Sequence, residues 1–475
     1  MPALKRSPNI LWICTDQQRL DSLGCYGNTF VRTPNIDALA SRGVKFQNAF
    51  CNSPVCTPSR ASFLTGRYPR TNRCRKNGQS LPNGEKLVTK LFADAGYRCG
   101  LVGKLHLSAC HPSVTPRREP RLDDGYSEFH WSHHPAPDWP ENDYSLWLAS
   151  KNAAYEPKEH SGSRYVVAGP PVELQQATWC AERAMDFIEA GEKLESPWLC
   201  SVNMFAPHHP FDPPADLLQR YLEALEKVPL PAFTPGELEN KTALQRRDHA
   251  AAYGIPDFYP FPEMSEKDHR CIRAAYWAMV DLIDLQVGRI MKTLEATGQA
   301  ENTVVIFMSD HGELLGDHGI YLKGPHFYSP SVRVPLILSY PPVIAAGKAD
   351  ALVELVDLAP TLLELAGLDI PRSMQGKSLV PVLQQPQLEH RESVFCENND
   401  FDDPGYSMMV QNRSHKLMTY YSGEGELYDL LADPGEVKNL WSDPAAQGHK
   451  IEMLDLMVRR LAETSDPGPQ RHALW

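Results

Sequence analysis

Short apolar runs bounded by turn residues recur along the chain, and segments with helical spacing separate them. Strands buried on both faces are predicted for residues 9–14, 99–102, 198–205, 303–308 and 334–339. Helices are predicted for residues 33–42, 177–190 and 268–297, and Thr33 and Pro34 offer the first of them an N-cap and an N1 proline. This alternation predicts an α/β fold, with a mostly parallel sheet sandwiched by helices.

Polar residues directly follow two of the predicted strands. Asp16 and Gln17 come after the run at 9–14, and Asp310 and His311 come after the run at 303–308. Open parallel sheets bind ligands at the carboxyl ends of their strands. We therefore expect both pairs at one edge of the sheet, where a ligand would bind.

The end of the chain has a different pattern. Apolar residues at 393–396, 406–410 and 415–421 predict a small antiparallel sheet, and residues 449–462 predict a helix that follows it. The sequence is accordingly divided into a larger domain, residues 1–385, and a smaller C-terminal α+β subdomain, residues 386–475. Two segments without clear periodicity, 110–170 and 232–262, are predicted to be long excursions, the first of them near the mouth of the site.

Composition narrows the class of protein. The chain has 475 residues, of which 42% are hydrophobic and 22% charged, as in ordinary soluble proteins. Its formal net charge of −12 disfavours a nucleic-acid partner. The first apolar run is short and is followed by Asp16, which favours a buried strand over a signal peptide or a membrane span. Eleven cysteines without a C-x-x-C pair predict reduced thiols in a cytoplasmic protein.

One motif carries the strongest chemical signal. The segment Cys56-Thr57-Pro58-Ser59-Arg60, with Thr65-Gly66-Arg67 after it, resembles the signature of the type I, formylglycine-dependent sulfatases of the alkaline phosphatase superfamily. The resemblance implies an alkaline-phosphatase-like fold with a catalytic domain at 1–385. It also implies that modifying machinery oxidises Cys56 to formylglycine (3-oxoalanine) during biosynthesis. The substrate implied is a small-molecule or carbohydrate sulfate ester. Whether the chain forms an oligomer stays open.

The polar pairs at the strand ends are candidate metal ligands. Asp16, Gln17, Asp310 and His311 could hold one divalent cation together with an oxygen derived from Cys56. Oxygen ligands favour Ca²⁺, with Mg²⁺ as an alternative, and the imidazole nitrogen admits Mn²⁺. The plainer alternative is that each pair only terminates a strand, and for either pair alone that reading would be preferred. Their combination with Cys56 favours a metal site.

The family resemblance also implies the catalytic residues, which are Cys56, Arg60, Lys104, His106, His208 and Lys323. Arg60 would hold the formylglycine, Lys104 would bind sulfate oxygens, and His106 would break down the covalent intermediate. Lys104 and His106 are expected on one side of an extended segment. His208, preferred over the adjacent His209, would protonate the leaving oxygen together with Lys323, while Asp310 would take the proton of the attacking hydroxyl.

Two alternatives to a sulfatase stay open: a hydrolase of another substrate class and a protein without catalytic activity. Phosphonate monoester or phosphodiester hydrolases of the same superfamily resemble the Asp16-Gln17 and Asp310-His311 pattern, although they carry alanine where this chain has Ser59. A non-catalytic anion-binding protein is the more distant possibility. Structural roles are expected for Asp317, His318 and His326, substrate contact or solvation for His130, His133 and His134, and a polar, carbohydrate-bearing partner for Arg117, Arg118 and Arg121.

Overall fold

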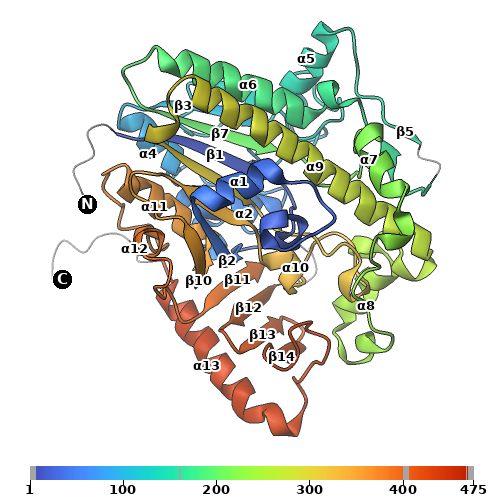
Figure 1. Cartoon of the computed structure of the whole chain (residues 1–475). Helices are drawn as coiled ribbons and strands as arrows, with labels where there is room; N and C mark the ends of the chain where they lie inside the picture. The colour runs from blue at the N-terminus through green and yellow to red at the C-terminus, as the bar shows by residue number, and fades with distance from the viewer. Residues whose placement is uncertain (1–6, 160–161, 400–405, 467, 469–475) are drawn as a thin grey trace, which may run out of the picture.

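The computed structural model describes residues 7–159, 162–399, 406–466 and 468, and an eight-stranded sheet runs through its larger part (Figure 1). Side by side, the strands are β10 (Gly347–Glu354), β2 (Val44–Phe50), β9 (Leu336–Ser339), β8 (Thr303–Ser309), β1 (Asn9–Thr15), β7 (Trp198–Met204), β3 (Arg98–Gly103) and β4 (Glu128–Trp131). Among these described strands, β9 alone is antiparallel to its neighbours. The predicted mostly parallel sheet is confirmed.

Helices bury apolar side chains on both faces of this sheet. One core contains residues of α2 (Cys56–Thr65), α4 (Val88–Asp94), α11 (Leu358–Leu365) and α12 (Val380–Gln384). The other contains residues of α1 (Pro34–Arg42), α5 (Asp143–Ser150), α6 (Gln176–Glu192), α7 (Ala215–Leu222) and α9 (Glu266–Ala296). The short helices α3 (Pro69–Asn72), α8 (Ala243–Ala250) and α10 (Ser329–Val332) lie in connecting segments. Figure 1 shows α6 and α9 side by side over the sheet.

The central strand β1 shows how one sequence serves both cores. Successive side chains of a strand point to opposite faces of its sheet. Ile10 and Trp12 pack in the core with α2, α4 and α11, whereas Leu11 and Ile13 pack in the core with α1, α6 and α9. All seven residues of the strand are buried. A continuous apolar run is therefore what this position in the sheet requires.

The beginning of α1 differs from its prediction in one respect. Thr33 occupies the N-cap position, but its side chain does not cap the helix. Asp284 of α9 instead accepts hydrogen bonds from the backbone N–H groups of Asn35 and Ile36, at 3.0 and 2.8 Å. The helix is confirmed. Its cap comes from a neighbouring helix, which a local sequence pattern does not reveal.

A second sheet and a long helix form the C-terminal part of the molecule (Figure 1). The antiparallel strands are, in order, β11 (Val394–Asn398), β12 (Ser407–Gln411), β13 (His415–Tyr420) and β14 (Gly425–Asp429). Helix α13 (Gln447–Glu463) packs against this sheet. The predicted small sheet and helix are thus confirmed, although 400–405 and 469–475 lie outside the described residues. The division of the chain at residue 385 stays a prediction.

Some elements have no counterpart among the predicted ones. Strands β2 and β10 pair in parallel at the edge of the main sheet, where Lys45 and Lys348 interrupt the apolar pattern. The excursion at 110–170, predicted to lack regular structure, contains β4, α5 and the short paired strands β5 (Lys158–Glu159) and β6 (Val167–Ala168). Among the described residues, no helix has both the length and the apolar composition that crossing a membrane requires.

Candidate active site

The site forms where two neighbouring strands end. β1 and β8 pair in register, with Thr15 opposite Ser309, so the residues that follow them emerge together. The Asp310 N–H donates to the Thr15 carbonyl at 3.2 Å, and the Gln17 N–H donates to Asp310 Oδ1 at 3.1 Å. The structure therefore brings Asp16, Gln17 and Asp310 together at the carboxyl edge of the sheet, as the sequence predicts.

Helix α2 carries the cysteine of the motif to the same edge. Cys56 is its first residue, and the whole helix is buried. Pro58 lies in the first turn, where a missing N–H is tolerated, and Gly66 ends the helix with a φ of 66°. Ser59 Oγ donates to the Asp310 carbonyl at 2.6 Å, which ties the helix to the end of β8. Cys56 and Arg60 consequently lie one helical turn apart beside the two carboxylates.

Cys56 lies at the centre of a buried cluster. Its Sγ lies 3.6 Å from Asp16 Oδ1, 3.1 Å from His311 Nε2 and 2.9 Å from the Nζ of Lys323. Burial and Asp16 raise the pKa of the Cys56 thiol, but Lys104, Lys323 and His311 outweigh them and lower it. The environment therefore stabilises negative charge at position 56.

Positive side chains surround the two carboxylates. Arg60 Nε lies 2.8 Å from Asp310 Oδ2, and its Nη2 lies 3.6 Å from Asp16 Oδ2. Lys104 Nζ donates to the same Asp16 oxygen. Burial opposes the charged form of Asp16, but the neighbouring cations, led by Lys104, hold its pKa well below the usual value. Asp16 is therefore an ionised carboxylate in a site with an excess of positive charge.

The acidic and imidazole donors fit a divalent cation. Ligand atoms of Asp16, Cys56, Asp310 and His311 all lie within 4.8 Å of one another. Burial lowers the pKa of His311, but Asp310 and Cys56 outweigh it and raise the value to about 9. A cation among the carboxylates would provide the positive charge that this proton supplies, and two carboxylates with one imidazole suit Ca²⁺, Mg²⁺ or Mn²⁺. Gln17 Oε1 accepts from Lys323 Nζ at 2.9 Å, so it too faces this cluster.

Lys104 and His106 reach the site by a route that the sequence does not predict. Strand β3 ends at Gly103, and His106 has a φ of 55°, so the segment is not extended. The buried carboxylate of Glu119 instead accepts hydrogen bonds from the N–H groups of His106, at 2.9 Å, of Leu107 and of Ser108. Burial, together with Lys104, lowers the pKa of His106 well below its usual value, so the imidazole is neutral.

Glu119 is therefore expected to act as a positioning residue. Glu119→Gln replaces one carboxylate oxygen by an amide that cannot accept from these N–H groups, and the turn that holds His106 should loosen. We expect kcat/KM for the reaction catalysed at this site to fall about tenfold or more, because a small displacement of a reacting group is costly. Glu141→Gln, at an acid that pairs with Arg117 in a side-chain contact away from the site, is the control. Equal kcat/KM values for the two variants would show that Glu119 does not position the site.

His208 and Lys323 complete the closed end of the site. Their Nε2 and Nζ atoms lie 2.8 Å apart, and His208 Nδ1 contacts the carbonyl of His209. Burial, the main cause, and the charge of Lys323, the second, lower the pKa of His208 well below its usual value. The contact with Lys323 favours His208 over His209 as the proton donor, because His208 and Lys323 can share one proton.

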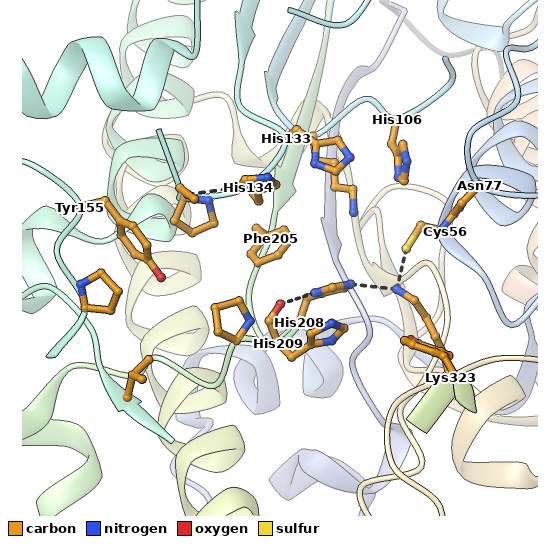
Figure 2. A pocket seen from close by; sticks show the side chains of 17 residues that line it. Cys56, Asn77, His106, His133, His134, Tyr155, Phe205, His208, His209 and Lys323 are labelled. Carbon is orange, nitrogen blue, oxygen red and sulfur yellow. Dashed lines mark hydrogen bonds between the residues drawn. The ribbon is translucent and has the colours of Figure 1, made fainter. Parts of the chain in front are cut away.

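These groups open into a cavity of about 640 Å³ (Figure 2). Its lining residues are Cys56, Asn77, Lys104, His106, His133, His134, Pro135, Ala136, Tyr155, Pro157, Val167, Phe205, His208, His209, Pro210, Tyr253 and Lys323. The cavity thus contains the predicted catalytic side chains apart from Arg60, which lies behind Cys56 against the carboxylates. A volume of this size suits a small molecule.

Several residues have roles that sequence reasoning assigned differently or missed. His133 and His134 line the cavity, whereas His130 does not. Arg117 and Arg118 pair with Glu141, Arg121 pairs with Asp124, and none of the three arginines lines the cavity, so the polar partner expected from them stays a prediction. Structural contacts are confirmed for Asp317 with Arg19, His318 with Glu237 and His326 with Asp248.

Asn77 and Tyr155 line the cavity without any signal in the sequence. Asn77 Oδ1 accepts from the N–H of Thr57 at 3.0 Å, next to Cys56. The Tyr155 hydroxyl donates to Asp212 Oδ2 at 2.6 Å, and burial raises the pKa of Asp212 to about 7. Both residues come from loops that lack periodicity. Only the folded chain reveals that these loops reach the site.

The mostly parallel sheet between helices, with candidate metal ligands gathered at its strand ends, is the fold of the alkaline phosphatase superfamily. The sequence matches the family model described as Sulfatase over residues 8–368, and the model described as N-sulphoglucosamine sulphohydrolase, C-terminal, over residues 316–464. The chain belongs to the sulfatase family and is a sulfatase.

Individual relatives fit this assignment. An arylsulfatase of Clostridium perfringens is 31% identical, covering 91% of this chain and 90% of the relative. An N-acetylglucosamine-6-O-sulfatase of Bacteroides thetaiotaomicron is 26% identical, covering 98% of this chain and 88% of the relative. The crystal structure of a phosphonate monoester hydrolase of Agrobacterium radiobacter is also similar, with a TM-score of 0.81, 26% identity and coverage of 97% and 96% of the two chains. The family thus supports sulfate ester hydrolysis.

Proposed function

We propose that this sulfatase cleaves sulfate monoesters by means of a formylglycine formed from Cys56 and one divalent metal ion. The observation that carries the proposal is the buried convergence of position 56 with Asp16, Asp310 and His311 at the closed end of the cavity. Modifying machinery would have to oxidise Cys56 before this chemistry begins. The other ten cysteines are free thiols, and they support a cytoplasmic location as a further part of the proposal.

Asp16, Asp310, His311 and Gln17 would hold the metal, with an oxygen of residue 56 beside them. When bound, the cation polarises the sulfate group and offsets its charge. Ca²⁺ is preferred because the carboxylate and amide donors are oxygen ligands. Lys104 and Lys323, which contact Asp16 and Cys56, are placed to bind the remaining sulfate oxygens, as charge stabilisation in a buried site requires.

Residue 56 would be the nucleophile. As a hydrated aldehyde it would supply two hydroxyl groups on one carbon, one of them to displace the ester oxygen from sulfur. Asp310, whose carboxylate Arg60 holds at 2.8 Å, is placed to take the proton of this hydroxyl.

The Lys323–His208 pair protonates the departing oxygen. His208 is neutral by itself, so the proton comes through the 2.8 Å contact with the lysine. His106, also neutral, is placed to take the proton of the second hydroxyl, which would let free sulfate leave and restore the aldehyde without an attacking water. A serine ester would lack this second hydroxyl, which explains the use of an aldehyde.

The effect of His208→Asn on kcat/KM should depend on the leaving group. Alkyl sulfates release a strongly basic oxygen that must be protonated, so their kcat/KM should fall about 10³-fold, within the range known for acid catalysis. A nitrophenyl sulfate releases a weakly basic oxygen, so its kcat/KM should fall only about tenfold. The measurement is the slope of log kcat/KM against leaving-group pKa over a series of sulfate esters. His209→Asn is the matched control, and it should shift the whole series evenly. The same slope for His208→Asn as for the unchanged enzyme would exclude His208 as part of the acid.

A phosphonate monoester hydrolase is the second candidate, favoured by the similar Agrobacterium structure and by Gln17 and His311 facing the metal cluster. The hydrogen bond from Ser59 to the Asp310 carbonyl gives this serine a structural part in the site. The deciding experiment compares kcat/KM for phenyl sulfate and for the monophenyl ester of phenylphosphonate on modified, metal-loaded enzyme. A higher value for the sulfate supports our proposal, and a strong phosphonate preference would overturn it.

A further inference from the structure

The two ends of the active-site cavity differ in chemistry (Figure 2). At the closed end lie Cys56, Lys104 and Lys323, which handle the sulfate group. Away from Cys56, Figure 2 shows Phe205 in the middle and Tyr155 at the far side. The remaining wall includes side chains without hydrogen-bonding groups, namely Pro135, Ala136, Pro157, Val167 and Pro210. The part of the site that must hold the alcohol is therefore largely apolar.

Most polar atoms near this wall already have partners inside the protein. The Tyr155 hydroxyl donates to Asp212, which is not part of the lining. His134 Nδ1 accepts from the N–H of Ala136 at 3.1 Å, and its Nε2 lies 3.1 Å from Asp138. These groups have little capacity left for hydroxyl groups of a ligand.

Three imidazoles of the lining keep unused polar atoms. Both ring nitrogens of His133 and the Nδ1 atoms of His106 and His209 are buried without a hydrogen-bond partner in the protein. The ring of His133 packs edge-on against His106, with their centroids 4.5 Å apart, so it lies beside the reacting groups rather than at the far wall. These nitrogens can serve an ester oxygen or one substituent. They are too few for a ring that carries a hydroxyl on nearly every carbon.

We propose that the alcohol released by this enzyme is a compact, neutral and apolar one, aromatic or aliphatic, rather than a sugar. This inference rests on the proposed sulfatase function and adds the class of its leaving group. Each buried hydroxyl without a partner costs on the order of 1–3 kcal/mol, whereas apolar surface placed against prolines and aromatic rings is favourable. Sites that lack polar partners therefore select against polyhydroxylated ligands.

Charge argues against a cationic or an acidic alcohol. No carboxylate and no guanidinium is among the described residues that line the cavity, whereas two lysines are. A quaternary ammonium could stack on Tyr155 or Phe205, but Lys104 already lies over the Phe205 ring, 5.4 Å from its centroid, and would repel it. A uronic acid would lack the arginine that usually binds its carboxylate.

The test compares esters with similar reactivity but different polarity on modified, metal-loaded enzyme. Cyclohexylmethyl sulfate and glucose 6-sulfate are both sulfates of primary alcohols, and choline sulfate supplies the cationic case. We expect kcat/KM for the cyclohexylmethyl ester to exceed the other two about 100-fold. Equal or higher values for glucose 6-sulfate or choline sulfate would overturn the inference while leaving the sulfatase function intact. If the enzyme cleaves none of these three esters and does not cleave 4-nitrophenyl sulfate either, the proposed function itself is contradicted.

Ala136 offers a direct test of the wall. Ala136→Asp places a carboxylate on it and should lower kcat/KM for cyclohexylmethyl sulfate about tenfold, the scale of one adverse pocket contact. Ala136→Leu, which keeps the wall apolar, is the matched control and should lose less. Methyl sulfate has no group that reaches this wall, so Ala136→Asp should lower kcat/KM for the cyclohexylmethyl ester more than kcat/KM for methyl sulfate. Equal losses by Ala136→Asp on the methyl and cyclohexylmethyl esters would contradict the proposed place of the alcohol.

Discussion

Cys56→Ala is expected to abolish sulfate ester hydrolysis, with kcat/KM at least about 10⁵-fold lower, a loss typical of removing a nucleophile. The alanine offers no oxygen to attack sulfur, although Asp16, Lys104 and Lys323 still bind the sulfate group. KM should therefore change much less than kcat. Steady-state kinetics with 4-nitrophenyl sulfate, together with binding of inorganic sulfate by calorimetry, would measure both effects.

Two further variants sharpen this experiment. Cys110→Ala removes a half-buried thiol outside the cavity lining and should leave kcat/KM unchanged. Cys56→Ser restores an attacking hydroxyl without the second hydroxyl, so sulfate should remain attached to residue 56 after one turnover, detectable by mass. Activity of Cys56→Ala close to that of the unchanged enzyme would exclude residue 56 as the nucleophile.

Asp310→Asn should also produce a large loss with every sulfate ester, about 10³-fold in kcat/KM. Asp310 is a candidate metal ligand and the partner of the buried Arg60 guanidinium, at 2.8 Å. Its neutralisation removes one negative donor and leaves Arg60 with a weaker partner. Removing one member of a buried ion pair costs about 3–5 kcal/mol in stability. Both activity and the free energy of unfolding should therefore fall.

The two effects can be separated by titration with Ca²⁺. In the unchanged enzyme, activity lost on chelation should return at low calcium concentration, whereas Asp310→Asn should need far more. Asp216→Asn, an exposed acid at the beginning of α7, is the control and should titrate like the unchanged enzyme. The same calcium requirement in Asp310→Asn and in the unchanged enzyme would show that Asp310 is not a ligand.

The sheet and the strand-end pairs were accessible to sequence reasoning because both follow from local patterns. Strands such as β1 must be apolar on both faces, which leaves a continuous run, and Asp16 and Asp310 stand directly after two of them. The resemblance to the family motif also predicted Cys56 and Arg60 as residues of the site. Parallel strands in one sheet end together, so residues 294 apart in sequence could be expected side by side.

Other features depend on contacts that a local pattern does not encode. Strand β10 at the edge of the sheet and its neighbour β2 carry lysines because Lys348 is exposed and Lys45 is only half-buried. Glu119 is a solitary acid in a segment without periodicity, and only the folded chain shows that it accepts the N–H groups around His106. Tyr155 likewise reaches the cavity from a loop. The chemistry of the catalytic end could be predicted, whereas the wall that selects the alcohol required the structure.

The central claim is that a cation and an oxidised side chain share one buried site, and the peptide that contains residue 56 tests it most directly. Mass analysis of this peptide, in active protein isolated from its native host, should show an aldehyde in place of the thiol. Labelling with an aldehyde-specific hydrazide should follow the activity across preparations. An intact Cys56 thiol in fully active enzyme would contradict the account.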